Sequence, residues 1–152
     1  MAHEAIRFRR KLNANDLERM RIPRRHWGAK FSEITGCTVA QRGSGDIPLV
    51  DALARYGKQM GEMSRDGIGL ILWGDNGTGK TSAIVCMGKE FRRRGYTVLF
   101  IQAAELKRFV AEKEHFDEDE TYWDRARSVD VLLLDDLGKG RDLIARPLEL
   151  AL

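Results

Sequence analysis

The stretch GDNGTGKT, residues 74–81, decides the fold of this chain. It satisfies the pattern GxxxxGK[ST], and Gly77 adds further backbone freedom inside the loop. An apolar run precedes the stretch and a helical pattern follows it, as phosphate binding requires. Glycines let successive backbone N–H groups point at one anion, and the helix that begins there adds its positive dipole end. The stretch therefore predicts a phosphate-binding loop.

This loop is expected to hold the phosphates of ATP. Lys80 would bridge the β and γ phosphates, which gives it a catalytic role, and the Thr81 hydroxyl would coordinate Mg²⁺. The residues expected to contact the nucleotide continue into the first helical turn: Gly74, Asp75, Asn76, Gly77, Thr78, Gly79, Lys80, Thr81 and Ser82.

A second motif, VLLLDDLG at residues 131–138, supplies two carboxylates. Four apolar residues place Asp135 and Asp136 at the carboxyl end of a strand, where a doubly wound sheet has its ligand crevice. Asp135 is the candidate for a water-mediated Mg²⁺ contact, and Asp136 for polarising an attacking water. The tandem carboxylates favour nucleotide hydrolysis over nucleoside kinase chemistry, which does not need them.

Strand and helix patterns alternate along the second part of the chain. Such alternation predicts an α/β fold of the P-loop NTPase type, with a parallel sheet covered by helices on both faces. The apolar runs are short enough for buried strands, and glycine or basic residues end the helices. The predicted elements are strand 67–73, helix 81–95, strand 97–101, helix 103–114 and strand 129–136.

The first part of the chain reads differently. A short helix is expected over residues 13–23, stopped before Pro23, and a glycine-rich connector over 35–48. A second helix is expected from Pro48, with Leu49, Leu53, Tyr56, Met60 and Met63 as its core stripe. We therefore divide the chain into a basic helical N-terminal segment with its connector (1–47) and a partial ATP-binding domain (48–152).

Composition limits the classes of function. With 152 residues, 43% hydrophobic and 32% charged, the chain is expected to form one globular domain with a real core. It has no apolar run near the roughly 18 residues of a membrane helix and no secretory signal pattern, so a cytoplasmic location is expected. Cys37 and Cys86 lack metal or disulfide spacing. His3, His26 and His115 are interpreted as structural or surface residues.

Positive charge is concentrated at the N-terminus. Residues 1–30 hold nine Lys or Arg against three acids and carry +6, whereas the whole chain carries +3. A basic segment suits a polyanion or an acidic protein surface. An ordinary solvated helix and arm explains the same charge equally well, because charge alone does not specify nucleic acid.

Three stretches together resemble a known family. GLILWGDNGTGKTSAI (69–84), VLLLDDLG and the upstream RIPRRHWGAKFSEI (21–34) are similar to the DnaC, DnaI and IstB group of AAA+ ATPases, which are helicase loaders and transposition helpers. The resemblance implies ATP at residues 74–81, Mg²⁺ at Thr81 and Asp135, and Asp136 at the position usually held by a catalytic glutamate. For Trp27 and Phe31 two interpretations stay open, contact with adenine or ordinary packing.

The resemblance also implies elements that follow residue 140 in this family. These are a sensor strand, an arginine finger and a helical lid, whereas here KGRDLIARPLELAL (139–152) predicts one helix. We therefore expect a fold that is incomplete at the C-terminus, with a gap in the sheet between 67–73 and 129–136. Unpaired backbone groups would border that gap. ATPase activity of the chain alone is expected to be small.

Two classes of function stay open on this basis. The first is a self-associating ATP-dependent loader that contacts single-stranded DNA and places a replicative helicase on it, with an IstB-like transposition helper as its near neighbour. The second is a truncated, non-hydrolysing ATP-binding module that engages a helicase through its basic N-terminal segment.

Overall fold

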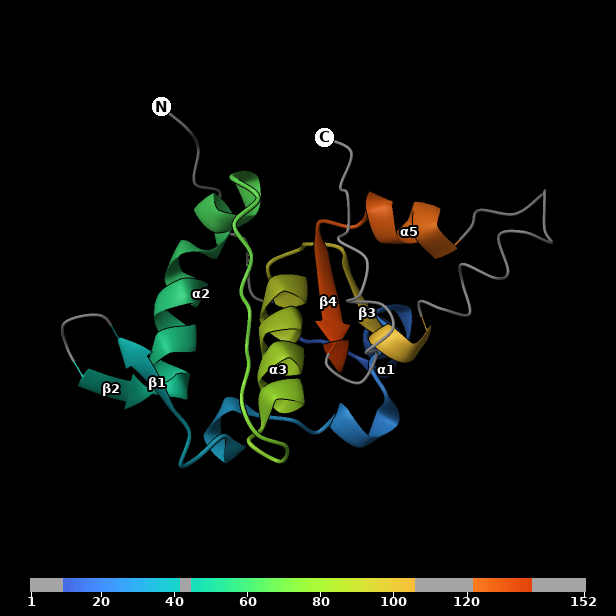
Figure 1. Cartoon of the computed structure of the whole chain (residues 1–152). Coiled ribbons are helices and arrows are strands. Elements are labelled where there is room, and N and C mark those ends of the chain that lie inside the picture. Colours follow the sequence, from blue (N-terminus) through green and yellow to red (C-terminus); the bar gives the residue numbers. More distant parts are fainter. Residues whose placement is uncertain (1–9, 42–44, 106–121, 138–152) are drawn as a thin grey trace.

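The chain folds into a mixed α/β arrangement in which the phosphate loop leads into a helix that packs on a parallel strand pair (Figure 1). The computed structural model describes residues 10–41, 45–105 and 122–137. In chain order the elements are α1 (Ala14–Arg19), η1 (Arg24–His26), η2 (Phe31–Glu33), β1 (Thr38–Gln41), β2 (Gly45–Pro48), α2 (Leu49–Arg65), α3 (Lys80–Arg93), β3 (Val98–Gln102), α5 (Tyr122–Ser128) and β4 (Val131–Asp135).

Strands β3 and β4 form the predicted parallel pair. Their register runs from Val98 opposite Val131 to Gln102 opposite Asp135. β3 is buried through Val98–Ile101, as its continuous apolar run predicts. Because the strands are parallel, Gln102 and Asp135 end at the same edge of the sheet. This edge faces the phosphate loop. The predicted strands 97–101 and 129–136 are confirmed, because they correspond to β3 and β4.

Helix α3 covers one face of this pair. Gly88 allows the close approach, since a Cβ there would lie 2.4 Å from Leu133 Cδ1. The helix ends as predicted before Gly95, whose φ is 93°. The Gly95 N–H donates to the Arg92 carbonyl and the Tyr96 N–H to that of Phe91, so the end is a Schellman motif. The basic last turn and the glycine stop therefore identified this helix correctly.

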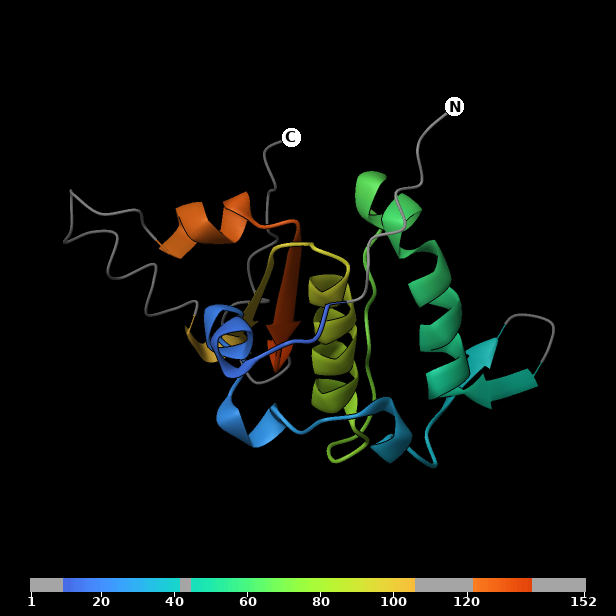
Figure 2. The same cartoon turned by 180° about the vertical axis from the view of Figure 1, so that it is seen from behind.

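The opposite face of β3 is covered as well. Ala126 of α5 packs with Leu99 and Ile101 in a separate apolar cluster. The N-terminal segment lies beside β3, because the Phe100 N–H donates to the Met20 carbonyl at 2.8 Å. Figure 2, seen from behind, shows α1 beside β3, away from α2. Helices therefore lie on both faces of the strand pair, as the sequence predicts.

The N-terminal segment packs into the main core. Asn13 caps α1 in a capping box with Asp16. Asp16 is buried and accepts from Arg92 of α3 at 3.2 Å, and it also pairs with Arg10. One apolar cluster joins this segment to α3 and the sheet, and it includes Leu17, Met20, Ile22, Ile34, Val85, Met87, Phe91, Phe100 and Leu133.

Residues 35–48 differ from the prediction of a glycine-rich connector. They contain an antiparallel hairpin in which β1 pairs with β2, with Val39 opposite Ile47. Each strand has only four residues, too few to show a clear alternation of apolar and polar positions. Helix α2 follows directly and buries Leu49, Leu53 and Met60 of the predicted stripe.

The prediction of a buried strand at 67–73 is wrong. Residues 68–74 run extended beside α3 but pair with no strand among the described residues. Ile71 is 78% exposed and Trp73 87% exposed. A strand needs a neighbour about 4.8 Å away to satisfy its backbone groups, and a cavity separates this segment from β4. A gap in the sheet is predicted from the sequence at this place.

Several predictions fall on residues outside the described ranges. They are the helix at 139–152, most of the helix at 103–114, and the side chains of His3 and His115. Within the described ranges, no helix is both long and apolar enough to cross a membrane.

Candidate nucleotide-binding site

Glycine geometry shapes the loop between residues 74 and 79. Gly74, Gly77 and Gly79 have positive φ values of 135°, 81° and 79°. Gly79 is also the residue that precedes the first turn of α3, where it adopts the left-handed conformation. A side chain at these positions would strain the backbone, which explains the glycine spacing of the motif. The loop therefore ends with the N-terminus of a 14-residue helix directed into the site.

Lys80 lies against the loop that it follows. Its Nζ donates to the Gly74 and Asp75 carbonyls at 2.9 and 2.6 Å and lies 3.3 Å from Thr78 Oγ1. Thr78 in turn donates to the Asp75 carbonyl at 2.8 Å. The ammonium group is thus held inside the curve of the loop. An ammonium there carries three donors and a full positive charge, which suits a polyphosphate.

Thr81 and Asp135 connect the loop to the sheet. The Thr81 hydroxyl lies 3.0 Å from both carboxylate oxygens of Asp135, although 54 residues separate the two in sequence. Asp135 is only 8% exposed. Asp135 is the last residue of β4 in the parallel register, so it lies at the sheet edge that faces the phosphate loop and the first turn of α3. The two residues that the sequence assigns to Mg²⁺ therefore lie in direct contact.

Asp136 follows with an unusual backbone conformation. Its φ is 58°, one of two positive values among the described non-glycine residues. Aspartate tolerates this left-handed region better than most residues, at a modest energetic cost. Asp136 lines the same cavity as the loop. The turn thus brings a second carboxylate to the site immediately after Asp135.

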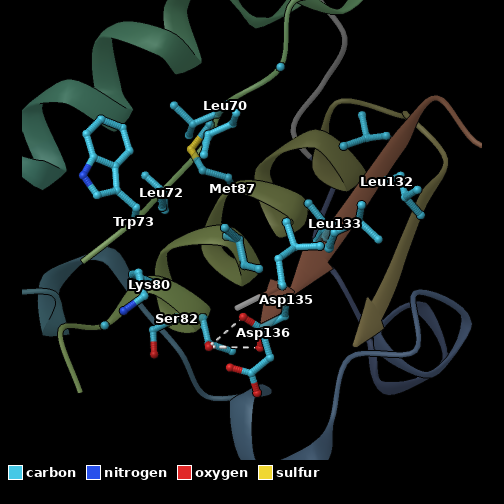
Figure 3. Close-up of a pocket in the computed structure, with 18 of the residues that line it drawn as sticks. Leu70, Leu72, Trp73, Lys80, Ser82, Met87, Leu132, Leu133, Asp135 and Asp136 are labelled. Carbon is cyan, nitrogen blue, oxygen red and sulfur yellow. Dashed lines mark hydrogen bonds between the residues drawn. The ribbon is translucent and has the colours of Figure 1, made fainter. Parts of the chain in front are cut away.

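A cavity of about 1240 Å³ contains the site. Figure 3 shows the extended segment 68–73 with Leu70, Leu72 and Trp73 along one side of the cavity, and β4 with Leu132 and Leu133 along the other. Lys80 and Ser82, in the first turn of α3, lie at the end of the cavity near Asp135 and Asp136. All the predicted nucleotide-contacting residues line it except Asp75, which contributes its carbonyl to Lys80 and Thr78.

The donor set fits a magnesium ion bound together with phosphates. A hydroxyl and a carboxylate converge at 3.0 Å, and both offer the oxygen ligands that Mg²⁺ prefers. In the part of the chain that the structure describes, no group of three or more His, Cys, Asp or Glu side chains could form a metal cage. Mg²⁺ in nucleotide sites commonly uses one or two carboxylates plus phosphate oxygens and water.

Arg25 and His26 of η1 are among the residues of this cavity that the sequence did not assign to the site. Arg25 Nε donates to His26 Nε2 at 3.1 Å. Burial and Arg25 lower the pKa of His26 below its ordinary value, against an opposing effect of Asp135. The basic run before Trp27 is visible in the sequence, but no local pattern relates it to the phosphate loop, which lies far along the chain.

Trp27 and Phe31 pack instead against the main core. Trp27 Nε1 donates to the Ile22 carbonyl at 2.7 Å, and both aromatic rings contact the main apolar cluster. Neither residue lines the cavity. Of the two interpretations, the structure favours ordinary packing.

The fold and the loop define a P-loop ATP-binding protein of the AAA+ type. The sequence matches the family described as "IstB-like ATP binding protein" over residues 61–143, more than half of the chain. The chain belongs to this family. The matched stretch contains the phosphate loop, α3, β3 and β4.

A curated relative adds a second similarity. The chromosomal replication initiator protein DnaA of Aquifex aeolicus (strain VF5) is 32% identical over 68 residues. That alignment covers 45% of this chain but only 17% of the relative. No solved structure matches the chain.

Proposed function

We propose that this protein binds Mg²⁺-ATP at residues 74–82 and uses the nucleotide to help place a replicative helicase on single-stranded DNA. The contact between Thr81 and Asp135 carries the nucleotide part of the proposal, because it joins loop and sheet at the position for a metal-bound phosphate. The loading part is supported by the resemblance to helicase loaders and by the similarity to a protein named a replication initiator. Self-association and a cytoplasmic location belong to the same proposal.

Each residue has a defined chemical role in this proposal. The loop N–H groups and Lys80 bind the phosphates, and Thr81 and Asp135 hold Mg²⁺, which would neutralise the negative charge that develops on the phosphoryl oxygens. Asp136 accepts a proton from the attacking water or polarises it. Aspartate has a shorter reach than glutamate, so its turn conformation decides where its carboxylate lies. The buried strand pair β3–β4 fixes the positions of both carboxylates.

The basic N-terminal segment is proposed to contact DNA or the helicase. Lys11, Arg19 and Lys30 are exposed, whereas Leu17, Met20 and Ile22 of the same segment are buried in the core. Exposed cations on a packed scaffold can bind phosphates in a salt-dependent manner. The segment can therefore offer charge to a partner without leaving the fold.

A second candidate function is an IstB-like transposition helper that acts with a transposase. The resemblance to transposition helpers supports it, and the chain's match to the IstB-like family is in keeping with it. The nucleotide site would be the same in both cases, and only the partner differs. A partner assay is therefore needed to separate them.

Substitution of Lys80 tests the nucleotide site. Lys80→Ala removes a charge-assisted phosphate contact worth about 1.5 to 3 kcal/mol, so ATP binding should weaken roughly ten- to a hundredfold in a calorimetric titration. Lys58→Ala, on the exposed face of α2, is the matched control and should bind ATP like the unsubstituted protein. Equal affinities for all three proteins would contradict the phosphate assignment.

The same proteins test the partner. Retention of a purified replicative helicase on single-stranded DNA should require ATP and should be lost in Lys80→Ala but not in Lys58→Ala. A parallel assay uses a purified transposase and its DNA. ATP-dependent retention of the transposase alone would support the second candidate and overturn helicase loading.

A further inference from the structure

The basic turn η1 lies at the same cavity as the phosphate loop. Arg25 and His26 line the cavity together with Lys80, Thr81 and Asp135. The charge of Asp135 acts on His26, so the turn is near the carboxyl end of β4. On that side of the cavity the proposed function places Mg²⁺ and the terminal phosphate.

Contacts on the C-terminal side hold this turn to α3. The Lys89 Nζ donates to the carbonyls of Trp27 and Ala29 at 2.7 and 2.9 Å. Lys89 is only 8% exposed, so these bonds to a buried ammonium are costly to lose. Lys89 lies in the helix whose N-terminus begins the phosphate site. The turn is thus fixed to the element that binds the nucleotide.

Contacts on the N-terminal side fix the turn as well. Ile22 is buried in the main core, and its carbonyl accepts from Trp27 Nε1 at 2.7 Å. Pro23 precedes the turn with φ −56°, a value that its ring imposes. The backbone of Arg24–His26 is therefore tied at both ends, and the side chains of the turn project from a fixed base.

The two arginines of the turn have different surroundings. Arg24 lies 3.6 Å from Glu18 and over the ring of Trp27, at 5.5 Å from its centroid. Arg25 forms no ion pair within the described residues, and its hydrogen bond there is to His26. The His26 ring accepts this hydrogen bond but carries no negative charge in either protonation state, so it does not compensate the Arg25 charge. Within the described residues, Arg25 is therefore a cation without an anionic partner, and it lines the cavity.

We propose that Arg25 binds the terminal phosphate of the nucleoside triphosphate and thereby makes the N-terminal segment sensitive to the state of the nucleotide. A guanidinium matches phosphate with two parallel hydrogen bonds, which gives it a geometry that Lys80 cannot supply. The segment that reads the phosphate also carries the exposed basic residues proposed to contact a partner. This inference rests on ATP binding at the phosphate loop.

The test compares a triphosphate with a diphosphate. A non-hydrolysable ATP analogue and ADP, each with Mg²⁺, are titrated calorimetrically into the full chain and its Arg25→Ala variant. Loss of a charge-assisted contact should weaken analogue binding roughly tenfold or more and change ADP binding less than about twofold. Arg24→Ala is the matched control, and both of its affinities should stay within about twofold of the unsubstituted protein.

The outcomes separate this inference from the proposed function. Equal weakening for the analogue and ADP, or an equal effect of Arg24→Ala, means that the turn acts only through structure and overturns the role of Arg25. No effect of Arg25→Ala overturns it as well, while a loss of binding in Lys80→Ala would still uphold the phosphate loop. Failure of Lys80→Ala to weaken binding overturns both. Because Arg25 is exposed, its variant should unfold at the same urea concentration as the unsubstituted protein.

Discussion

Strand β4 and the extended segment 68–73 flank the same cavity, and both are short apolar runs that lead into the nucleotide site. β4 pairs with β3 along its whole length and turns Leu133, 8% exposed, into the core. The segment 68–73 has no strand partner in the described part of the chain, and its Tyr56 contact joins a side-chain hydroxyl to the Ile68 carbonyl at 3.0 Å. Apolar composition therefore does not ensure burial. A strand is buried only where a neighbour satisfies its backbone.

The largest expected difference between the two regions is in amide hydrogen exchange. Backbone amides of β3 and β4 that pair in the ladder should exchange only through global unfolding, while those of Ile71 and Leu72 exchange from the folded state. For a stability of about 5 kcal/mol, protection should differ by roughly 10³-fold or more. Native-state exchange followed by NMR measures this. Slow exchange at Ile71 equal to that at Leu133 would show that the segment is paired in solution.

A smaller contrast is expected for truncation of one side chain on each side. Leu133→Ala removes a core contact with α3 and should lower the free energy of unfolding by about 2 to 3 kcal/mol. Ile71→Ala should change it by less than about 0.5 kcal/mol, because Ile71 is exposed. Urea denaturation of both variants checks this. A similar loss of free energy of unfolding in both variants would show that Ile71 is packed as tightly as Leu133.

The smallest expected effect concerns Asp16, whose contact with Arg92 attaches the N-terminal segment to α3. Burial alone would raise the pKa of Asp16, but the backbone N–H of Asn13 together with Arg10 and Arg92 holds it below the ordinary value. A lowered folded pKa means that Asp16 contributes stability above its unfolded pKa, 3.8, and that this contribution is lost as pH falls through the folded value. Asp16→Asn should therefore cost about 1.5 kcal/mol at pH 7, and progressively less as the pH falls through the folded pKa.

Urea denaturation at several pH values measures this difference, with Glu62→Gln on the exposed face of α2 as the control. The control should change stability by less than about 0.5 kcal/mol. A cost of Asp16→Asn that stays the same from pH 7 to pH 2 would mean that packing, not charge, fastens the segment.

Local patterns predicted much of the fold and named most of the polar residues that the structure brings together at the candidate site. Three features follow from residues close together in sequence. They are the glycine positions of the loop, helix α3 with its glycine stop, and the strands β3 and β4. The hairpin at 38–48 was not predicted, because two four-residue strands carry too little periodicity. Contact between Thr81 and Asp135 could be expected, because a phosphate loop and a strand that ends in carboxylates both belong at the carboxyl end of a doubly wound sheet.

The chemistry of the site is therefore determined by sequence, since a phosphate loop needs its glycines, its lysine and its hydroxyl at fixed spacing. Tertiary structure decided what depends on contacts between distant segments. Lys89 bonds to the Trp27 carbonyl across 62 positions and thereby fixes Arg25 at the cavity. Among the described residues the segment 68–73 has no strand partner, because the strand pair lies across the cavity from it. No local pattern contains either fact, because both arise from which surfaces meet when the chain packs.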